Sequence, residues 1–143
     1  MPPTAPTPTV PTPTAPSPSP SVPKFAARSC KKDVKKNRFA LRLNTDNYGS
    51  ETSFAVYKMK KQGNFEKEIF HSGYGSFVGN TVNDLTRCLK STTCFKVEVR
   101  DTFGDGMCCQ FGNGSFQAYW GGQEVSNSSF EGGSVREFEF GNC

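Results

Sequence analysis

Short stretches in which hydrophobic and polar residues alternate recur along the chain from Phe39 onward. Phe39, Leu41 and Leu43 alternate with polar or small residues, and the same period of two returns in 95–99. This period places successive side chains on opposite faces of a β-strand. We expect further strands over 53–59, 66–71, 115–120 and 135–140.

Glycine-rich turns separate these segments, and no stretch longer than a turn has helical periodicity. Many short strands joined by turns predict an antiparallel β-sandwich of jelly-roll or immunoglobulin-like type. Residues 39–143 are enough for one such module, which would bury roughly 65% of the surface of the unfolded chain. We expect the 13 phenylalanines of the chain to fill its core rather than to form a binding strip.

The first 23 residues contain all ten prolines, whereas all 14 glycines lie at Gly49 or later. Residues 5–19 consist of three related units, Ala-Pro-Thr-Pro-Thr, Val-Pro-Thr-Pro-Thr and Ala-Pro-Ser-Pro-Ser. Proline at nearly alternate positions removes backbone N–H donors and disfavours helix. We therefore expect residues 1–23 to form an extended polyproline-II arm.

Threonine and serine hydroxyls surround this arm evenly, because polyproline II has about three residues per turn. Proline tracts rich in Ser and Thr are common carriers of O-linked glycans. We expect O-glycosylation at Thr4, Thr7, Thr9, Thr12, Thr14, Ser17, Ser19 and Ser21. The alternative is an unglycosylated, disordered linker, because disorder has the same residue preferences.

Residues 24–38 form a basic connector, with seven Lys and Arg side chains against the single acid Asp33, a net charge of +6. The module 39–143 has ten basic and twelve acidic residues, a net charge of −2. Such a connector suits an anionic polysaccharide, an acidic neighbouring subunit or nucleic acid, or it is a solvated spacer. We expect no nucleic-acid partner, because the folded part lacks a basic helix and an evident stacking platform.

Six cysteines predict three disulfides formed in an oxidising compartment: Cys30, Cys88, Cys94, Cys108, Cys109 and Cys143. Zinc is a poorer explanation, because adjacent Cys108 and Cys109 do not match the paired spacing of zinc ribbons and His71 lies far from a cysteine cluster. We expect Cys30 to pair with Cys143, which would stabilise the module by at most about 4.7 kcal/mol in the chain-entropy model. The other four cysteines would form two local disulfides, and the sequence leaves open which of them pair.

Two sequons, beginning at Asn113 and Asn127, also favour the secretory route. The sequence shows no apolar run long enough to span a membrane and no signal-peptide h-region near Met1. We expect an extracellular protein without a membrane span.

Two turns resemble each other: Asp46-Asn-Tyr-Gly and Asp101-Thr-Phe-Gly each follow a predicted strand. We expect them to form equivalent loops at one end of the sandwich. Carboxylates at short spacing supply the oxygen ligands that Ca²⁺ prefers, so a structural calcium site is expected from Asp46, Glu51, Asp101 and Asp105. The metal-free alternative is that these aspartates close Asx-turns and that the glycines supply positive φ.

The sequence does not predict catalysis. His71 is the only histidine and has no nucleophile at a recognisable spacing. Paired carboxylates for glycoside cleavage would need a deep cleft, which a module of this size rarely provides. We expect no catalytic residues and a structural or surface role for the histidine.

The run Asp-Thr-Phe-Gly-Asp-Gly-Met-Cys-Cys-Gln-Phe-Gly-Asn-Gly-Ser-Phe, from Asp101 to Phe116, has a Gly-Asp-Gly-x-Cys-Cys core. With Cys94-Phe and Thr45-Asp-Asn-Tyr-Gly-Ser-Glu-Thr-Ser-Phe, it resembles a secreted module repeated in extracellular proteins of algae, other protists and some bacteria. Joined to the Pro/Thr arm, the chain is also similar to protomers of glycosylated extracellular fibrils known from freshwater samples. The resemblance implies a β-sandwich repeat, N-terminal segments that bridge successive subunits, and a structural role.

Together these features predict a structural subunit of an extracellular glycosylated filament, a homo-oligomer that assembles head to tail. The docking segment, expected to contact an exposed sheet edge of the next copy, comprises Ser21, Val22, Pro23, Lys24, Phe25, Ala26 and Ala27. One alternative is a carbohydrate-binding module with Tyr48, Phe103, Tyr119 or Trp120 as stacking platforms. The other is a calcium-dependent adhesion module on a glycosylated linker.

Overall fold

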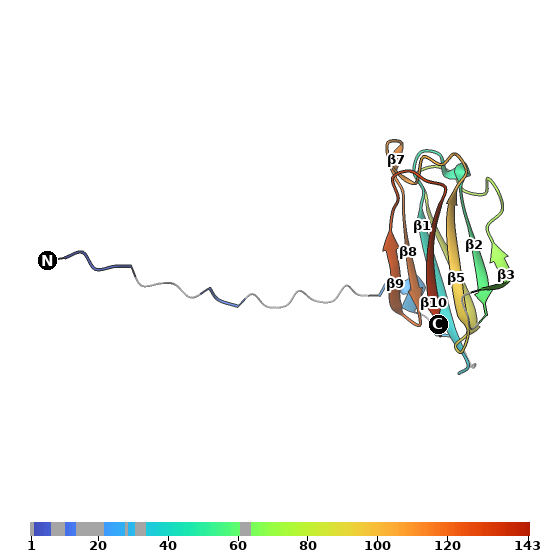
Figure 1. Ribbon diagram of the computed structural model, residues 1–143, viewed down its shortest axis with the longest axis horizontal. Coiled ribbons are helices and arrows are strands. Elements are labelled where there is room, and N and C mark those ends of the chain that lie inside the picture. Colours follow the sequence, from blue (N-terminus) through green and yellow to red (C-terminus); the bar gives the residue numbers. More distant parts are fainter. Residues whose placement is uncertain (1, 7–10, 14–21, 28, 31–33, 61–63) are drawn as a thin grey trace.

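Two four-stranded antiparallel sheets packed face to face make up the folded part of the protein in a computed structural model (Figure 1). The structure describes residues 2–6, 11–13, 22–27, 29–30, 34–60 and 64–143. The elements are α1 (Lys24–Ala27), β1 (Lys36–Asn44), the 3-10 turn η1 (Gly49–Glu51), β2 (Thr52–Met59), β3 (Phe65–His71), β4 (Val82–Lys90), β5 (Cys94–Asp101), β6 (Cys108–Cys109), β7 (Gly112–Asn113), β8 (Ser115–Trp120), β9 (Gln123–Ser128) and β10 (Val135–Gly141). The predicted all-β sandwich class is confirmed.

The strands follow an interleaved order. Sheet A has the order β4-β1-β8-β9 and sheet B the order β10-β5-β2-β3, while β6 and β7 form a separate small hairpin. Within the two sheets, only β2–β3 and β8–β9 pair strands that follow each other in the chain. The other neighbours come from distant parts of the sequence.

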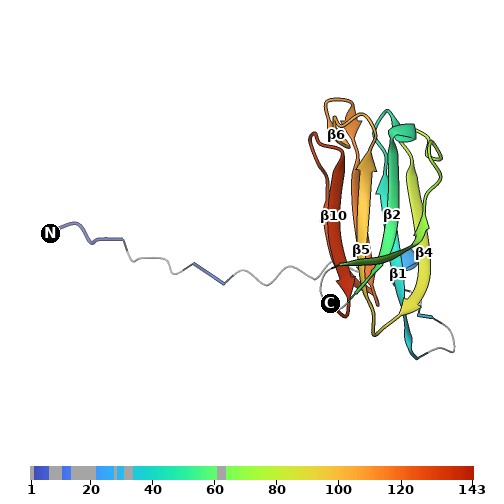
Figure 2. The same ribbon diagram turned by 45° about the vertical axis from the view of Figure 1, so that its right-hand side comes forward.

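The antiparallel order divides the connections between two ends of the sandwich (Figures 1 and 2). The loops 45–51, 72–81, 102–114 and 129–134 gather at one end, which we call the loop end. The entry of the N-terminal segment, the β4–β5 turn 91–93 and the C-terminus lie at the opposite end, which we call the arm end.

Inward-facing positions of the alternating strands form the core. Phe39 and Leu41 of β1, Val97 of β5 and Phe116 of β8 are fully buried, and Phe39 stacks on Phe140 with ring centroids 4.4 Å apart. Burying a side chain of this size contributes about 1.5–3 kcal/mol relative to leaving it exposed. Most phenylalanines that the structure describes therefore serve the core, as predicted.

The six predicted strands are confirmed, but β4 and β9 lacked a clear sequence signal. Both are edge strands that face the core with only part of their length. In β4 the partly buried Leu85 and Leu89 are four residues apart, a spacing that does not indicate a strand by itself. Weak alternation is the expected pattern for an edge strand that is only partly covered.

The short α-helix α1 packs on the outer face of sheet A. Ala26 is 1% exposed, and the ring of Phe25 contacts Tyr119 edge-on with centroids 5.7 Å apart. The guanidinium of Arg42 lies 4.4 Å from the Phe25 ring centroid and also pairs with Asp84 at 2.7 Å. The described part of the basic connector thus belongs to the folded module, and β1 itself begins inside it. Among the described residues, no helix has the length and apolar character needed to cross a membrane.

Three disulfides form, as the cysteine count predicted, but the expected pairing was wrong. Cys30 pairs with Cys88 and Cys94 with Cys143, while Cys108 pairs with its neighbour Cys109 across a cis peptide bond. Cys30 and Cys143 are attached to elements that belong to different sheets. The segment around α1 lies against sheet A, whereas β10 pairs with β5 in sheet B and places Gly141 opposite Cys94.

The two long-range disulfides attach both boundaries of the module to the same turn. Cys88 and Cys94 flank the β4–β5 turn, so a covalent path from Cys30 to Cys143 crosses only residues 88–94. The closed loops separate their cysteines by 58 and 49 residues. Each contributes about 4 kcal/mol in the chain-entropy model.

Stretching a single oxidised molecule between handles at its two ends should therefore not unfold the sandwich. Force would pass through the 88–94 path, which includes only the end of β4 and the first residue of β5, and would leave the rest of both sheets unloaded. After reduction, residues 30–143 should extend to about 400 Å at roughly 3.5 Å per residue. Optical-tweezers recordings check this, with a Cys108→Ser/Cys109→Ser variant as the control that should behave as wild type. A long unfolding step in the oxidised wild type would contradict the pairing.

Candidate functional site

The two similar Asp loops meet at the loop end and share one backbone geometry. The Tyr48 N–H donates to the Asp46 carboxylate at 2.9 Å, and the Phe103 N–H donates to Asp101 at 3.3 Å. Each bond joins residue i to i+2 and closes an Asx-turn. The expectation of equivalent loops at one end of the sandwich is confirmed.

Three of the four predicted calcium ligands come together in these loops. Carboxylate oxygens of Glu51, Asp101 and Asp105 all lie within 4.8 Å of one another. Asp46 is not part of this group, although it is buried in the neighbouring loop. Carboxylates in this arrangement suit a hard cation such as Ca²⁺.

Burial and mutual repulsion disfavour the charged forms of this cluster. Asp101 is 3% exposed, and burial raises the pKa of its carboxyl, with a further rise from Asp105. Backbone N–H donation from Gly106 at 2.6 Å and from Phe103 acts against this rise. Burial also raises the pKa of Glu51, and the nearby aspartates add to it. A cation at this position would offset the repulsion among these carboxylates.

The structure also contains the Asx-turns and positive-φ glycines that explain the Asp-x-x-Gly-Asp-Gly sequence without a metal ion. Gly104 and Gly106 have φ values of 79° and 88°, which favour glycine. A Cβ on Gly106 would lie 2.2 Å from the backbone nitrogen of Gly132. The Asx-turns and glycines thus explain the sequence run without an ion.

Two of the four predicted aromatic platforms are exposed at the loop end. Tyr48 is 47% and Phe103 78% exposed, whereas Tyr119 is covered by the α1 segment and Trp120 packs against Phe140. The structure adds Tyr74, which is 78% exposed. The one sequence signal for it was its place in a Ser-Gly-Tyr-Gly-Ser stretch, which is typical of an exposed loop.

The predicted glycosylation positions that the structure describes are accessible. Asn113 in β7 and Asn127 in the edge strand β9 are exposed, as are Thr4 and Thr12 in the arm. The other predicted O-glycosylation positions lie outside the described residues: Thr7, Thr9, Thr14, Ser17, Ser19 and Ser21. The polyproline conformation of the arm stays a prediction.

Most of the predicted docking segment lies in the described part of the chain. Val22, Lys24 and Ala27 are exposed, whereas Phe25 and Ala26 pack against the chain's own sheet A. Of the other two residues, Pro23 is half-buried and Ser21 lies outside the described residues. The contact of Phe25 and Ala26 is intramolecular in this structure.

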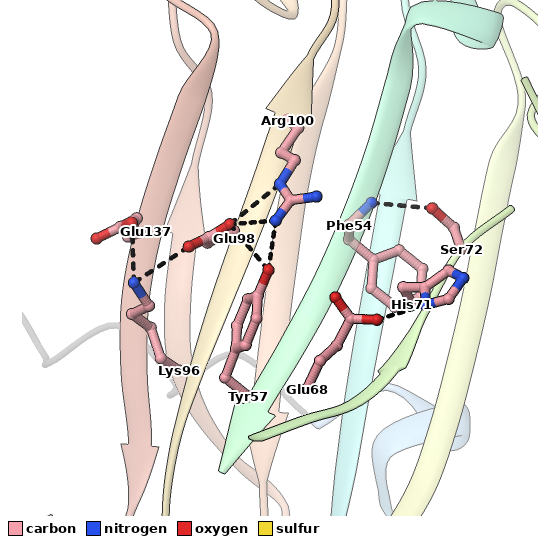
Figure 3. A network of polar contacts seen from close by, with 9 residues as sticks. All are labelled: Phe54, Tyr57, Glu68, His71, Ser72, Lys96, Glu98, Arg100 and Glu137. Carbon is pink, nitrogen blue, oxygen red and sulfur yellow. Dashed lines mark hydrogen bonds and ion pairs between the residues drawn. The ribbon is translucent and has the colours of Figure 1, made fainter. Parts of the chain in front are cut away.

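A network of charged side chains covers the outer face of sheet B (Figure 3). Glu98 accepts from Lys96 at 3.1 Å and from Arg100 at 2.5 Å, and Lys96 also pairs with Glu137 at 3.0 Å. The Tyr57 hydroxyl contacts Arg100 and donates to Glu98. Burial raises the pKa of Glu98, but hydrogen bonds from Arg100 and Lys96 outweigh it, so the net shift is downward.

The only histidine lies on the same face, at the end of β3. Its Nδ1 lies 2.6 Å from the Glu68 carboxylate, and both side chains are exposed. This placement agrees with the expected surface role.

A comparison with protein-family models, curated proteins and solved structures found no match to this chain. The functional interpretation consequently depends on the geometry and chemistry of the molecule itself.

Replacing Glu98 by Gln should lower the free energy of unfolding by about 2 kcal/mol at neutral pH. This is less than the 3–5 kcal/mol for breaking a fully buried ion pair, because Arg100 is 40% exposed. Because the folded protein lowers the pKa of Glu98, this carboxylate stabilises the fold above the ordinary carboxyl pKa of 4.5. The stabilisation is lost as the pH falls through the folded-state value.

Denaturant unfolding from pH 7 downward should show that the free energies of unfolding of the two proteins converge below pH 4.5. Glu139→Gln, on the exposed neighbouring strand, is the control and should change stability by less than about 0.5 kcal/mol. If the difference in free energy of unfolding between the wild type and Glu98→Gln is the same at all pH values, the ionic role of Glu98 is contradicted.

Proposed function

We propose that this protein is a structural subunit of an extracellular, glycosylated filament, in which the arm of one copy docks on the sandwich of the next. The observation that carries the proposal is the attachment of Cys30 and Cys143 to one turn through Cys88 and Cys94. Force that enters through the arm acts on α1 first and then passes from Cys30 through the disulfide into β4, so it does not strip β1 from its sheet. A subunit under tension needs this property, whereas a tethered sugar-binding module does not.

The same disulfide limits which residues can reach another copy. Cys30 follows Ala26 by only a few residues, so the buried α1 contact is held within its own chain. We therefore assign the intermolecular contact to the arm that precedes Pro23. Its prolines cannot supply the N–H donors of an added β-strand, but a polyproline-II segment can dock in a groove lined by aromatic and apolar side chains.

A groove of this kind lies between the edge strands β3 and β4 and has a volume of about 490 Å³. We call it the docking groove; its apolar lining comprises Leu41, Leu43, Phe54, Phe77, Val82 and Leu85. Val82 is 61% exposed at its border, and Ile69 and Val78 are exposed nearby. An apolar opening beside two unpaired sheet edges is suited to a partner segment.

The opposite side of the sandwich is less suited to this contact. There the edge strand β9 carries the exposed sequon residue Asn127, and a glycan at this position would cover the edge. A contact between the arm of one copy and the β3–β4 side of the next is heterologous, and its repetition without closure produces a filament.

Electron microscopy of the secreted full-length protein tests this assembly. We expect uniform filaments from the wild type and none after deletion of residues 2–21. Val82→Glu should also prevent assembly, because it places a charge in the docking groove, whereas Val125→Glu on β9 should not. Filaments that persist without the arm, or that respond to the β9 variant instead, would contradict the proposal.

A structural calcium ion at the loop end is a second proposal, supported by the grouping of Glu51, Asp101 and Asp105. Calcium at about 100 times its Kd should add about 2.7 kcal/mol to the free energy of unfolding, a rise in Tm of roughly 10 °C for a module of this size. Asp105→Asn should abolish the response, while Glu131→Gln in the adjacent loop should retain it. An identical Tm in calcium and in EDTA would show that the Asx-turns alone hold the loops.

A further inference from the structure

A second groove, of about 530 Å³, crosses the outer face of sheet B near the loop end. We call it the serine groove; its polar lining includes Ser53, His71, Tyr74, Arg100, Thr102 and Ser134. These residues come from β2, β3, β5 and three loops, so only the folded sheet brings them together. Arg100 is the member of the network described above that lines this groove, and Glu68 and His71 of β3 line it as well (Figure 3).

Tyr74 is a fixed aromatic side chain at the border of the serine groove. Its hydroxyl donates to the Thr102 hydroxyl at 2.8 Å, and Thr102 in turn donates through its N–H to the Glu51 carbonyl at 3.0 Å. The residue is nevertheless 78% exposed. A ring held at its tip and open to solvent can stack on the apolar face of a sugar with little loss of conformational entropy.

The floor of the groove offers hydrogen-bonding groups that the protein does not use. Among the described residues, the hydroxyls of Ser53 and Ser134 have no hydrogen-bond partner. One guanidinium nitrogen of Arg100 points away from Glu98 towards β2 and is likewise without a partner in the described part of the chain (Figure 3). Hydroxyls that donate and accept, next to a guanidinium that donates, match a ligand rich in hydroxyl groups.

Local charges disfavour an anionic ligand. Arg100 is paired with Glu98, the Glu68 carboxylate lies against His71 Nδ1, and Asp101 adds a further carboxylate to the lining. We propose that the serine groove binds a neutral saccharide, and that its source is the O-linked glycan on the arm of a second copy.

This assignment of the source rests on the proposed filament function. The serine groove and the docking groove are adjacent, because both are lined by Phe54, His71 and Ser72. An arm seated between β3 and β4 would place a glycan on one of its Thr residues beside the serine groove. Proximity along the docked arm would raise the effective concentration of the sugar and allow a weak contact to contribute.

The test is an NMR titration of the full-length, unglycosylated, oxidised protein. Three probes are compared: neutral oligosaccharides released from the glycosylated arm, the intact arm glycopeptide, and the same peptide without sugar. We expect the released oligosaccharides and the glycopeptide to shift the amide signals of Ser53, Tyr74, Arg100 and Ser134. Tyr74→Ala should weaken oligosaccharide binding about tenfold, as expected for loss of one aromatic stacking contact.

Two variants provide matched controls. Tyr48→Ala removes another exposed aromatic side chain of the loop end and should leave the affinity unchanged. Tyr74→Phe keeps the ring but loses the bond to Thr102, so it should weaken binding by only about twofold. Each variant is compared with the wild type for its dispersed amide spectrum, which reports that it is folded.

The outcomes separate this inference from the filament proposal. Binding of the released oligosaccharides with loss in Tyr74→Ala supports the groove. A panel of gluco-, manno- and galacto-oligosaccharides is titrated as well. If these sugars shift the amide signals and the arm glycan does not, the arm is not the source of the ligand. Absence of shifts with every sugar would overturn the groove itself, while filaments that still depend on the arm and on Val82 would leave the structural function in place.

Discussion

The covalent connection of both module boundaries to the β4–β5 turn is the constraint on which the rest of the molecule depends. Cys30–Cys88 attaches the segment before β1 to sheet A, and Cys94–Cys143 attaches the last residue to sheet B. Because the two anchor points are adjacent along the chain, the sheets are also held together at this end. These disulfides supply part of the free energy of unfolding, and the hydrophobic core supplies the rest. The opposite end of the sandwich consists of longer loops.

The sandwich uses its two outer faces differently. Sheet A is covered by Phe25 and Ala26, which bury Ala40 and Tyr119 and bring the entering chain close to β4. Sheet B carries hydrogen-bonded charges on its outer face, with Lys96 only 7% exposed. A polar face of this kind resists non-specific association, because removing its charges from water is unfavourable without matched partners. In the proposed filament, the polypeptide contact between copies would therefore use the edges of the sheets.

These features support the proposed structural function. The docking groove and the serine groove share His71 and Ser72 in their linings, so in this proposal the arm and its sugars lie on neighbouring surfaces. The loop end adds a carboxylate cluster whose potential favours a cation. The two long-range disulfides lie at the arm end, whereas the carboxylate cluster lies at the loop end.

The sequence by itself determined the local features of this protein. Alternation predicted strands around Phe39 and Val97, proline spacing predicted an extended arm, and the aspartate turns were predicted at one end, because each of these depends on neighbouring residues alone. Edge strands such as β4 were missed, since partial burial leaves no strict pattern. Only the tertiary structure decided which cysteines pair and which side chains share a site. Cys30 meets Cys88, and Tyr74 meets Thr102, because strands distant in the sequence become neighbours in the sheets, and pairing order is a property of the whole chain.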